Sequence, residues 1–324
     1  MDRRTLLVAC TAAVAPFHAF AQDAFPARAV RIVVGFPPGG GADVVARQVA
    51  QHMGATLGQP VVVDNKAGAG GNIAAEYVVN SPADGYTLYL ATASNAVNAA
   101  AAANGTLKLN YDLRKDLAPV VQLVRNQNVL VAHPSLPAAS VKDVISLAKG
   151  KPGTLNFGVM SATSQLAGEL FRQMANVAIT DVPYKGAAPV VTDLIGGQVQ
   201  LAILDAAVVL PHIQSGKLKA LAVTAATRFD GLPQVPTMAE SGVPGYEAIG
   251  WLGLMAPAAT PPQAIARLRD AAAKALSQAE VTAELKRLGV TPAAGSSQQF
   301  GSFVRDETAK WQKVMKAGNI TLGS

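Results

Sequence analysis

The chain has 324 residues, half of them hydrophobic and 15% charged, with a formal net charge of +6 at pH 7. A chain of this length exceeds the usual size of one domain and can bury a large core without disulfides, so two domains are expected. Its basic residues are scattered, which gives no support to a nucleic-acid surface. Cys10 is the single cysteine, which excludes a disulfide or a thiolate metal cluster within the chain.

The N-terminus has the three parts of a secretory signal peptide. Arg3 and Arg4 form a positive region, residues 6–17 are apolar but too short to span a bilayer, and residues 19–21 fit an A-x-A cleavage site. We therefore predict a signal peptide at 1–21 and export to the periplasm; an ordinary N-terminal helix is the alternative. No later segment has the run of about 20 apolar residues that a transmembrane helix needs.

Short β-branched runs alternate with helical stretches, a pattern typical of an α/β fold with mostly parallel sheets. In the first part of the chain, strands are predicted at 30–36, 61–64, 86–91, 120–124 and 129–132, and helices at 42–56 and 72–79. Apolar Val45, Val49 and Met53 recur at spacing four in the first of these helices. A polar break at 125–128 separates the last two strands.

A second series of similar size follows. Strands are predicted at 155–157, 181–184, 199–204, 218–224 and 249–255, and helices at 141–149, 165–174, 188–195 and 207–214. Two long amphipathic helices at 263–277 and 297–316 close the chain, with 279–288 between them. Two such series without a low-complexity linker predict two lobes facing a cleft, lobe 1 at 22–126 and 250–324 and lobe 2 at 127–249. Ligands bind outside the carboxyl ends of parallel strands, so the loops after the strands are the candidate site.

The loop after the first strand reads Phe36-Pro37-Pro38-Gly39-Gly40-Gly41-Ala42-Asp43. Its glycines let the backbone N–H groups approach a ligand, and the following helix N-terminus favours an anion. It lacks the Lys-Ser/Thr pair of a Walker A loop and the G-x-G-x-x-G spacing, so a carboxylate fits better than a nucleotide. The alternative is a turn with a helix cap, in which Asp43 is an acid of the first helical turn.

Two further loops of the first lobe resemble this one. The segment 66–72, Lys-Ala-Gly-Ala-Gly-Gly-Asn, is either a second wall of the cleft or only a tight connection. The segment 91–95 ends the third strand with neutral hydrogen-bonding side chains, including Thr92 and Ser94, which suit a carboxylate that must be released again. The alternative role is a helix N-cap formed by Ser94 or Asn95.

In the second lobe, the loop from Gly158 to Ser164 offers hydroxyl and N–H groups to a second anionic group, and Ser164 is also a candidate N-cap. Lys185 follows the next strand and is either an ion-pair donor or a solvated side chain. Asp205 follows the apolar segment 201–204. It either binds an N–H or hydroxyl group of the ligand or caps the next helix.

Catalytic motifs are absent from the sequence. It contains no H-E-x-x-H, no G-x-S-x-G and no EF-hand pattern, and after the signal peptide only His52, His133 and His212 remain, far apart. We therefore expect a binding protein with no metal, no cofactor and no catalytic residue. An exported hydrolase or isomerase would need Asp43 or Asp205 as its general base.

Four motifs occur in order along the chain: F-P-P-G-G-G-A-D at 36–43, P-A-D-G-Y-T-L at 82–88, V-P-Y-K-G-A-A-P-V-V-T-D-L-I-G-G-Q-V at 182–199 and L-P-H-I-Q-S-G-K-L-K-A-L-A-V-T at 210–224. Together they resemble the Bug family of periplasmic solute-binding proteins, the receptor component of tripartite tricarboxylate transporters. The resemblance covers essentially the whole mature chain. It implies a two-lobed, type II-like Venus-flytrap fold with a hinge of two crossovers.

The resemblance also implies a function. The ligand would be a small carboxylate, such as a dicarboxylate or tricarboxylate, an acidic amino acid or an aromatic acid, and the partners would be the membrane permease subunits of the transporter. We expect a monomer without a nucleic-acid partner. A sensor that signals to a membrane kinase is the alternative that the same fold permits.

The resemblance finally implies the binding residues. In lobe 1 these are Phe36, Pro38, Gly39, Gly40, Thr92 and Ser94, and in lobe 2 the loop with Gly158, Ser161, Thr163 and Ser164, with Lys185 and Asp205 as further candidates. The family usually has G-S-x-G-x-G-S/T in the second-lobe loop, whereas this chain has fewer glycines and carries Val159 and Met160. That wall is therefore expected to be more apolar, which suits a ligand with a hydrophobic body or alters how lobe 2 binds the second carboxylate.

Overall fold

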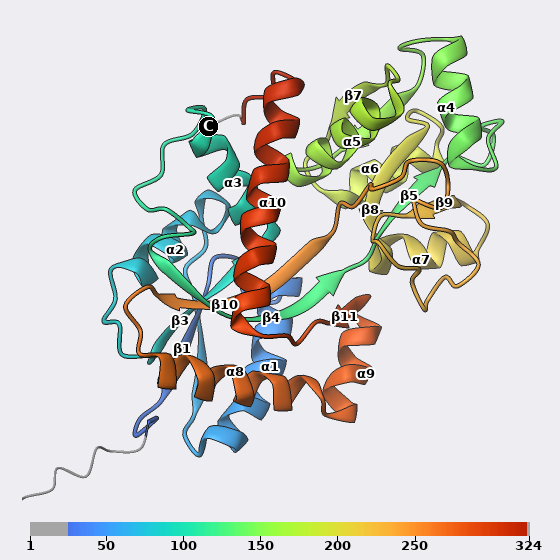
Figure 1. Cartoon of the computed structure of the whole chain (residues 1–324). Helices are drawn as coiled ribbons and strands as arrows, with labels where there is room; N and C mark the ends of the chain where they lie inside the picture. The colour runs from blue at the N-terminus through green and yellow to red at the C-terminus, as the bar shows by residue number, and fades with distance from the viewer. Residues whose placement is uncertain (1–24, 323–324) are drawn as a thin grey trace, which may run out of the picture.

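The computed structural model describes residues 25–322. The predicted signal peptide at 1–21, including Cys10, lies outside the described residues. Within 25–322, no helix combines the length and the apolar character that crossing a bilayer requires. The described chain forms two sheets, each covered by helices on both faces (Figure 1).

The first sheet has six strands in the order β11-β4-β10-β3-β1-β2. Their bounds are β1 (Val30–Val34), β2 (Val61–Asn65), β3 (Thr87–Thr92), β4 (Leu117–Asn126), β10 (Gly250–Pro257) and β11 (Val290–Pro292). The strand β1 pairs in parallel with β2 and β3, whereas β10 is antiparallel to β3 and β4. Successive side chains of β1 pack into two different hydrophobic layers, one on each face of the sheet. Ile32 and Val33 point to opposite faces and are both fully buried.

Helices cover both of these faces. Their bounds are α1 (Gly41–Leu57), α2 (Asn72–Val79), α3 (Ala93–Ala103), α8 (Pro262–Leu276), α9 (Ala279–Arg287) and α10 (Ser297–Ala317), with a 3-10 turn η1 (Ala69–Gly71) before α2. The helices α1, α8 and α9 share a core with Ile32, and α2, α3 and α10 share one with Val33. On α1, the predicted apolar stripe of Val45, Val49 and Met53 is buried.

The second sheet has five strands in the order β7-β6-β8-β5-β9. Their bounds are β5 (Asn128–Ala132), β6 (Asn156–Val159), β7 (Thr180–Pro183), β8 (Leu201–Asp205) and β9 (Lys219–Val223), and the helices are α4 (Val141–Gly150), α5 (Ala162–Ala175), α6 (Ala187–Ile195) and α7 (Ala206–Gln214). The strand β6 pairs in parallel with β7 and β8, and β5 is antiparallel to β8 and β9. The α/β class and the two-lobed fold are thus as predicted.

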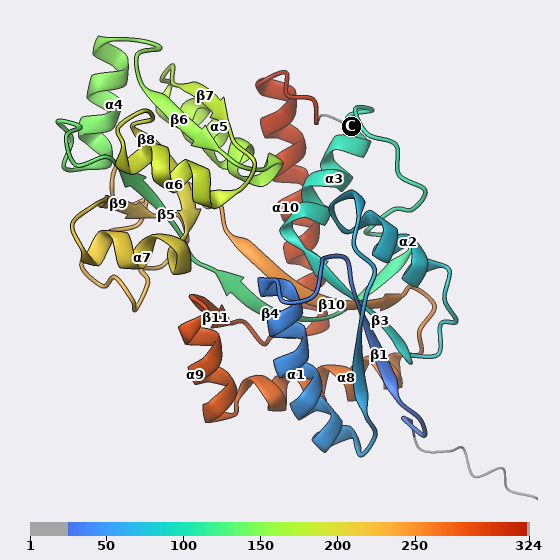
Figure 2. The same cartoon turned by 180° about the vertical axis from the view of Figure 1, so that it is seen from behind.

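The sheets contain more antiparallel pairing than expected, and the reason is how the chain passes between them. The strands β4 and β10 lie side by side and antiparallel: β4 leads the chain from the first sheet toward the second, and β10 leads it back (Figures 1 and 2). Only Gln127 separates β4 from β5, so the predicted polar break is one residue long. The predicted lobe boundaries at 126/127 and 249/250 agree with the strand membership of the two sheets and stay a prediction.

The helix α3, the strand β11 and the short 3-10 turn η1 were not predicted from the sequence. The helix α3 follows β3 directly and is built mainly of Ala, the residue with the highest helix propensity. The strand β11 has three residues and forms only through pairing with β4, which no local pattern reveals. The helix α5 also begins earlier than expected, at Ala162, because Ser161 rather than Ser164 is its N-cap.

The helix α10 connects the two halves of the molecule. It packs against α3 and β4 of the first sheet and against α5 of the second (Figure 1). The Gln173 side chain on α5 donates a hydrogen bond to the carbonyl of Val314 at 3.0 Å. Trp311 is buried and shares one hydrophobic core with residues of both sheets, among them Val33 and Phe157.

Candidate binding site

A cavity of about 700 Å³ lies between the two sheets. Four helices begin at its wall, each directly or shortly after a strand: α1 after β1, α3 after β3, α5 after β6 and α7 after β8. Two of these helices belong to each sheet. The first N–H groups of a helix lack an intrahelical acceptor and carry partial positive charge. The cavity therefore receives this charge from both sides.

The corner before α1 keeps its helix N-terminus free of a side-chain cap. Gly40 is the N-cap residue in an extended conformation, and no side chain bonds to the first helical N–H groups. Gly39 has φ of +80°, which the turn needs and which glycine tolerates. The loop thus contains the expected early-turn acid, Asp43, but no side-chain cap, and Gly40, Gly41 and Ala42 at the start of α1 line the cavity.

Asp43 fixes this corner from behind. Its carboxylate accepts hydrogen bonds from the N–H of Gly39, from Arg47 Nε and from Asn65 Nδ2, each at 2.9 Å. Asn65 Nδ2 also donates to the carbonyl of Phe36 at 3.0 Å. Burial alone would raise the pKa of Asp43, but these hydrogen bonds and the charge of Arg47 outweigh it and lower the pKa to about 2. The loop is consequently held by an ionised carboxylate.

The corner before α3 is held by a buried polar cluster. The hydroxyl of Tyr89 lies 2.9 Å from Asn95 Oδ1 and 3.0 Å from the carbonyl of Gly71, and Asn95 Oδ1 accepts the N–H of Thr92 at 2.9 Å. A Cβ on Gly71 would lie 2.9 Å from the Tyr89 hydroxyl, so this approach requires glycine. None of the residues 66–72 lines the cavity, so this segment is not one of its walls. It supports Thr92 from behind through the side chains of Tyr89 and Asn95.

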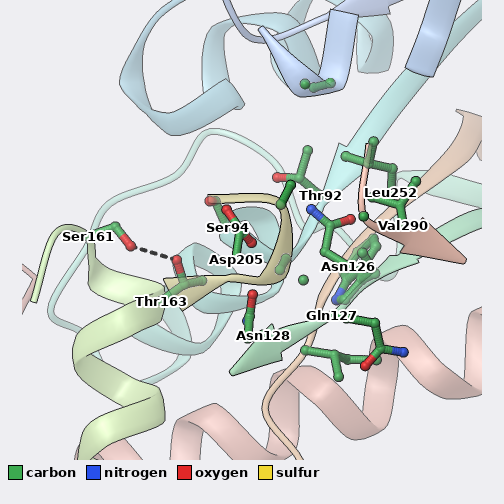
Figure 3. Close-up of a pocket in the computed structure, with 18 of the residues that line it drawn as sticks. Thr92, Ser94, Asn126, Gln127, Asn128, Ser161, Thr163, Asp205, Leu252 and Val290 are labelled. Atoms are coloured by element: carbon green, nitrogen blue, oxygen red, sulfur yellow. Dashed lines mark hydrogen bonds between the residues drawn. The ribbon is translucent and has the colours of Figure 1, made fainter. Parts of the chain in front are cut away.

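The corner before α5 presents hydroxyl groups. Ser161 and Ser164 form a capping box, in which Ser161 Oγ accepts the N–H of Ser164 at 3.2 Å and Ser164 Oγ accepts the N–H of Ser161 at 3.0 Å. Thr163 Oγ1 lies 2.9 Å from Ser161 Oγ (Figure 3). A Thr or Ser hydroxyl both donates and accepts, so this pair can turn a donor toward a ligand oxygen.

The corner before α7 presents an acid. Asp205 ends β8 and occupies the N-cap position of α7, but its side chain makes no cap hydrogen bond. Burial raises the pKa of Asp205. In Figure 3 its side chain lies in the same cavity as Thr92, Ser94 and Thr163.

The rest of the wall is mainly apolar. It includes residues from the loops after β1 and β6, from β8 and α7, from the second crossing at 249–252 and from the α9–β11 turn, namely Phe36, Met160, Ile203, Val208, Ile249, Trp251, Leu252, Leu288 and Val290. Arg287 is the one basic residue among the lining residues, and its guanidinium is paired with Glu284. Within residues 25–322, no group of three or more His, Cys, Asp or Glu side chains could hold a metal ion.

Comparison with known proteins shows which family has this architecture. The family model described as "Tripartite tricarboxylate transporter family receptor" matches residues 45–320. Protein BugT of Bordetella pertussis is 38% identical over 313 residues, which are 96% of this chain and 94% of BugT. The chain belongs to the tripartite tricarboxylate transporter receptor family. Its likeness to the Bug proteins, inferred from four motifs, is thereby confirmed.

Two solved structures resemble this receptor in fold as well as in sequence. "R. palustris Rpa4515 with adipate" is 39% identical with a TM-score of 0.74, and the match covers 92% of this chain and 99% of that one. "MatC (Rpa3494) from Rhodopseudomonas palustris with bound malate" is 32% identical with a TM-score of 0.71, covering 90% and 99%. Because the family consists of periplasmic binding receptors, the prediction that this protein is not an enzyme is also confirmed.

The receptor brings most of the predicted binding residues to one cavity. Those that line it are Phe36, Gly40, Thr92, Ser94, Ser161, Thr163, Ser164 and Asp205. Four others do not line it: Pro38, Gly39, Gly158 and Lys185.

These four residues have other surroundings in the receptor. The N–H of Gly39 is bonded to Asp43. Gly158 is inside β6, where a Cβ would lie 2.7 Å from a methyl group of Val190. Lys185 is exposed, as expected for a solvated side chain. Direct ligand contact by these residues stays a prediction that this geometry does not favour.

Sequence reasoning missed part of the receptor's cavity. Asn126, Gln127 and Asn128 line it at the crossover (Figure 3), whereas the sequence pattern predicts only a polar break there. Trp251 also lines it and comes from the second crossing strand. The polarity of the segment 126–128 was the available signal, because three amide side chains between two apolar strands are unusual for a simple connection. Nothing local indicates that Arg287, far along the chain, reaches the same cavity.

Proposed function

We propose that this receptor binds one small carboxylate in the cavity between its lobes and delivers it to the membrane subunits of a tripartite tricarboxylate transporter. The observation that carries the proposal is the convergence of four helix N-termini, two from each sheet, on one cavity. Such termini stabilise anions through N–H groups and partial charge. The relatives that hold adipate and malate support a carboxylate as the ligand.

The binding mode follows from the positions of these helices. One carboxylate would be bound by N–H groups at the starts of α1 and α3, near Gly40, Thr92 and Ser94, and the other end of the ligand by Ser161 and Thr163 on α5. A ligand that bridges both lobes favours the closed conformation, since it gains contacts only there. The hinge would be the two crossings, at Gln127 and before Gly250, between lobes 22–126 with 250–324 and 127–249.

Export completes the proposal. A signal peptide at 1–21 would carry the monomeric receptor to the periplasm, where the membrane subunits can receive the ligand from it. Sequencing the N-terminus of the protein recovered from the periplasm tests this point, and cleavage elsewhere than after Ala21 would correct it.

Calorimetry with the refolded protein tests binding. Refolding removes any ligand carried through purification. We expect heat of binding with at least one carboxylate and none with the amide or alcohol of the same skeleton. No heat with a panel of aliphatic and aromatic carboxylates would refute the proposal.

A matched pair of variants tests the site. Thr163→Val removes one hydroxyl at the cavity and should weaken binding about threefold to tenfold, the usual effect of one neutral hydrogen bond. Thr192→Val makes the same change on α6, where the hydroxyl donates only to the carbonyl of Ala188. It should leave the affinity unchanged, and equal effects of the two variants would contradict the assigned site.

A further inference from the structure

The carboxylate of Asp205 lacks a partner in the cavity. Among residues 25–322 it forms no salt bridge, and although it is the N-cap residue of α7 it accepts no cap hydrogen bond. The strand register places Asp205 opposite Asn128, whose amide nitrogen is directed to the carbonyl of Ala248. Asp205 is half-buried at the cavity wall. An acid withdrawn from solvent is normally paired or hydrogen-bonded, so an unpaired one beside a binding cavity calls for a ligand group that donates to it.

No other charge in the cavity compensates this acid. The lining residues contain two titratable side chains, Asp205 itself and Arg287. The guanidinium of Arg287 is bonded to Glu284 and 71% of its side chain is exposed. The groups of α3 and α5 that face the cavity, among them Ser94 and Thr163, are neutral. Burial accordingly raises the pKa of Asp205, with no opposite charge to lower it.

The two sides of the cavity therefore have different preferences. The starts of α1 and α3 favour a carboxylate. The Asp205 corner repels a second negative charge and favours a hydroxyl or ammonium group. A plain dicarboxylate brings no donor for Asp205, whereas a substituted one brings a donor beside its carboxylates.

We propose that Asp205 is a specificity-determining residue that selects carboxylates bearing a hydroxyl or amino group over their unsubstituted counterparts. This inference rests on the proposed carboxylate function and specifies which substituent the preferred carboxylate bears. A ligand with an ammonium group should gain most affinity, because the ammonium pairs with the ionised carboxylate of Asp205 and neutralises its charge. A hydroxyl gains one hydrogen bond to a charged acceptor.

A competing arrangement makes the opposite prediction. If Asp205 were protonated in the complex, it would donate its proton to the second carboxylate of a plain dicarboxylate. Such binding would strengthen as the pH falls, because the proton must be present on one of the two acids.

Matched ligands separate the two arrangements. Calorimetry on the refolded full-length mature receptor would compare succinate, malate and aspartate, which differ only in H, OH or NH₃⁺ at one carbon, and the six-carbon series adipate, 2-hydroxyadipate and 2-aminoadipate. At pH 7.5 we expect a substituted member to bind at least about tenfold more tightly than its plain parent.

The Asp205→Asn variant assigns this preference to the residue. It removes the charge and keeps an acceptor oxygen, so the amino ligand should lose about tenfold in affinity, the plain dicarboxylate should gain, and the hydroxy ligand should change least. Asp205→Leu, which also removes the acceptor, should abolish the preference for the hydroxy ligand. Asp230→Asn on the exposed surface is the control and should change no affinity.

The outcomes distinguish this inference from the proposed function. Binding of the plain dicarboxylates as tightly as the substituted ones, or more tightly as the pH falls, overturns the inference and leaves the carboxylate receptor intact. The same holds if Asp205→Asn leaves the ratios unchanged. If none of the six compounds nor any member of the wider carboxylate panel binds, the proposed function fails and the inference with it.

Discussion

Asp205 in the cavity wall and Asp43 behind the loop before α1 have opposite surroundings, and their effects on stability should be opposite as well. Asp43 is 2% exposed and receives three hydrogen bonds, whereas Asp205 receives none. A carboxylate that is bonded when ionised has a lowered pKa and stabilises the fold. One that is buried without a partner has a raised pKa and destabilises it.

For Asp43, the folded pKa of about 2 lies below the unfolded value near 3.8. Its contribution is therefore fully present above about pH 4 and is lost as the pH falls toward 2. It amounts to about 2 kcal/mol, because one pKa unit corresponds to about 1.4 kcal/mol. Urea unfolding between pH 2 and 7 should show this acid-labile difference between the wild type and Asp43→Asn. A constant difference across this range would mean that Asp43 is not ionised in these bonds.

For Asp205, the folded pKa is above the unfolded one. Protonation of Asp205 therefore stabilises the folded state. The loss of stability caused by the ionised carboxylate is absent well below pH 4 and grows as the pH rises above the unfolded pKa. Asp205→Asn should accordingly raise the melting temperature at pH 7 and change it little at pH 3. The exposed Asp230→Asn is the matched control for the loss of one negative charge. A lower melting temperature at pH 7 would reveal a partner for Asp205.

At the scale of elements, the receptor holds its binding corners with polar groups that never touch the cavity. Asn65 and Asp43 fix the loop before α1, and Tyr89 with Asn95 fixes the start of α3. The segment 66–72 takes part through the carbonyl of Gly71. Preformed corners of this kind lower the entropy that a ligand would otherwise lose in ordering the loop.

Tyr89→Phe tests this arrangement. The change removes one fully buried hydroxyl and leaves acceptors on Gly71 or Asn95 unsatisfied, which should cost about 1–3 kcal/mol in the free energy of unfolding. Ligand affinity should fall as well, because Thr92 is no longer held. Tyr77→Phe, on a residue that is 41% exposed, is the matched control and should change neither quantity. Unchanged affinity in a destabilised Tyr89→Phe protein would show that the corner is held by other contacts.

At the scale of the molecule, the α9–β11 turn of the first sheet touches the α7 corner of the second. A Cβ on Gly289 would lie 3.0 Å from both the Cβ and the nitrogen of Ala207. This turn lines the cavity next to Arg287 and Leu288. The spacing between the lobes at this edge thus depends on the absence of one side chain.

Gly289→Ala should therefore hold the lobes apart and weaken ligand binding. Gly289 has φ of +70°, so the variant also loses about 1–2 kcal/mol of stability to backbone strain. Gly216→Ala separates the two effects, because Gly216 has φ of +69° and nothing within 4 Å of the added carbon. Both variants should lose similar stability in urea, and only Gly289→Ala should lose affinity and a ligand-induced decrease in the radius of gyration measured by X-ray scattering. Equal affinities would show that this contact does not limit closure.

The local features of this protein follow from short stretches of its sequence. The apolar spacing of Val45, Val49 and Met53 predicted a helix, the glycines at 39–41 predicted a corner that opens a helix N-terminus, and four motifs predicted the family. These features are local because they depend on backbone conformation and on side-chain period, which neighbouring residues fix. The observed helix boundaries differ from the predicted ones by a few residues where a capping residue such as Ser161 sets the start of the helix.

Which of the similar loops meet at the cavity depends on long-range packing, which no single stretch of sequence contains. The loops at 36–43 and 66–72 are both rich in glycine, yet one lines the cavity and the other lies behind Tyr89, because β2 is the edge strand and β1 is inside the sheet. Asp205 gained its importance in the same way, since the missing partner is a property of its surroundings and not of its sequence. Strand order and the two crossings bring residues far apart in the chain to one cavity, and local pattern contains no record of that order.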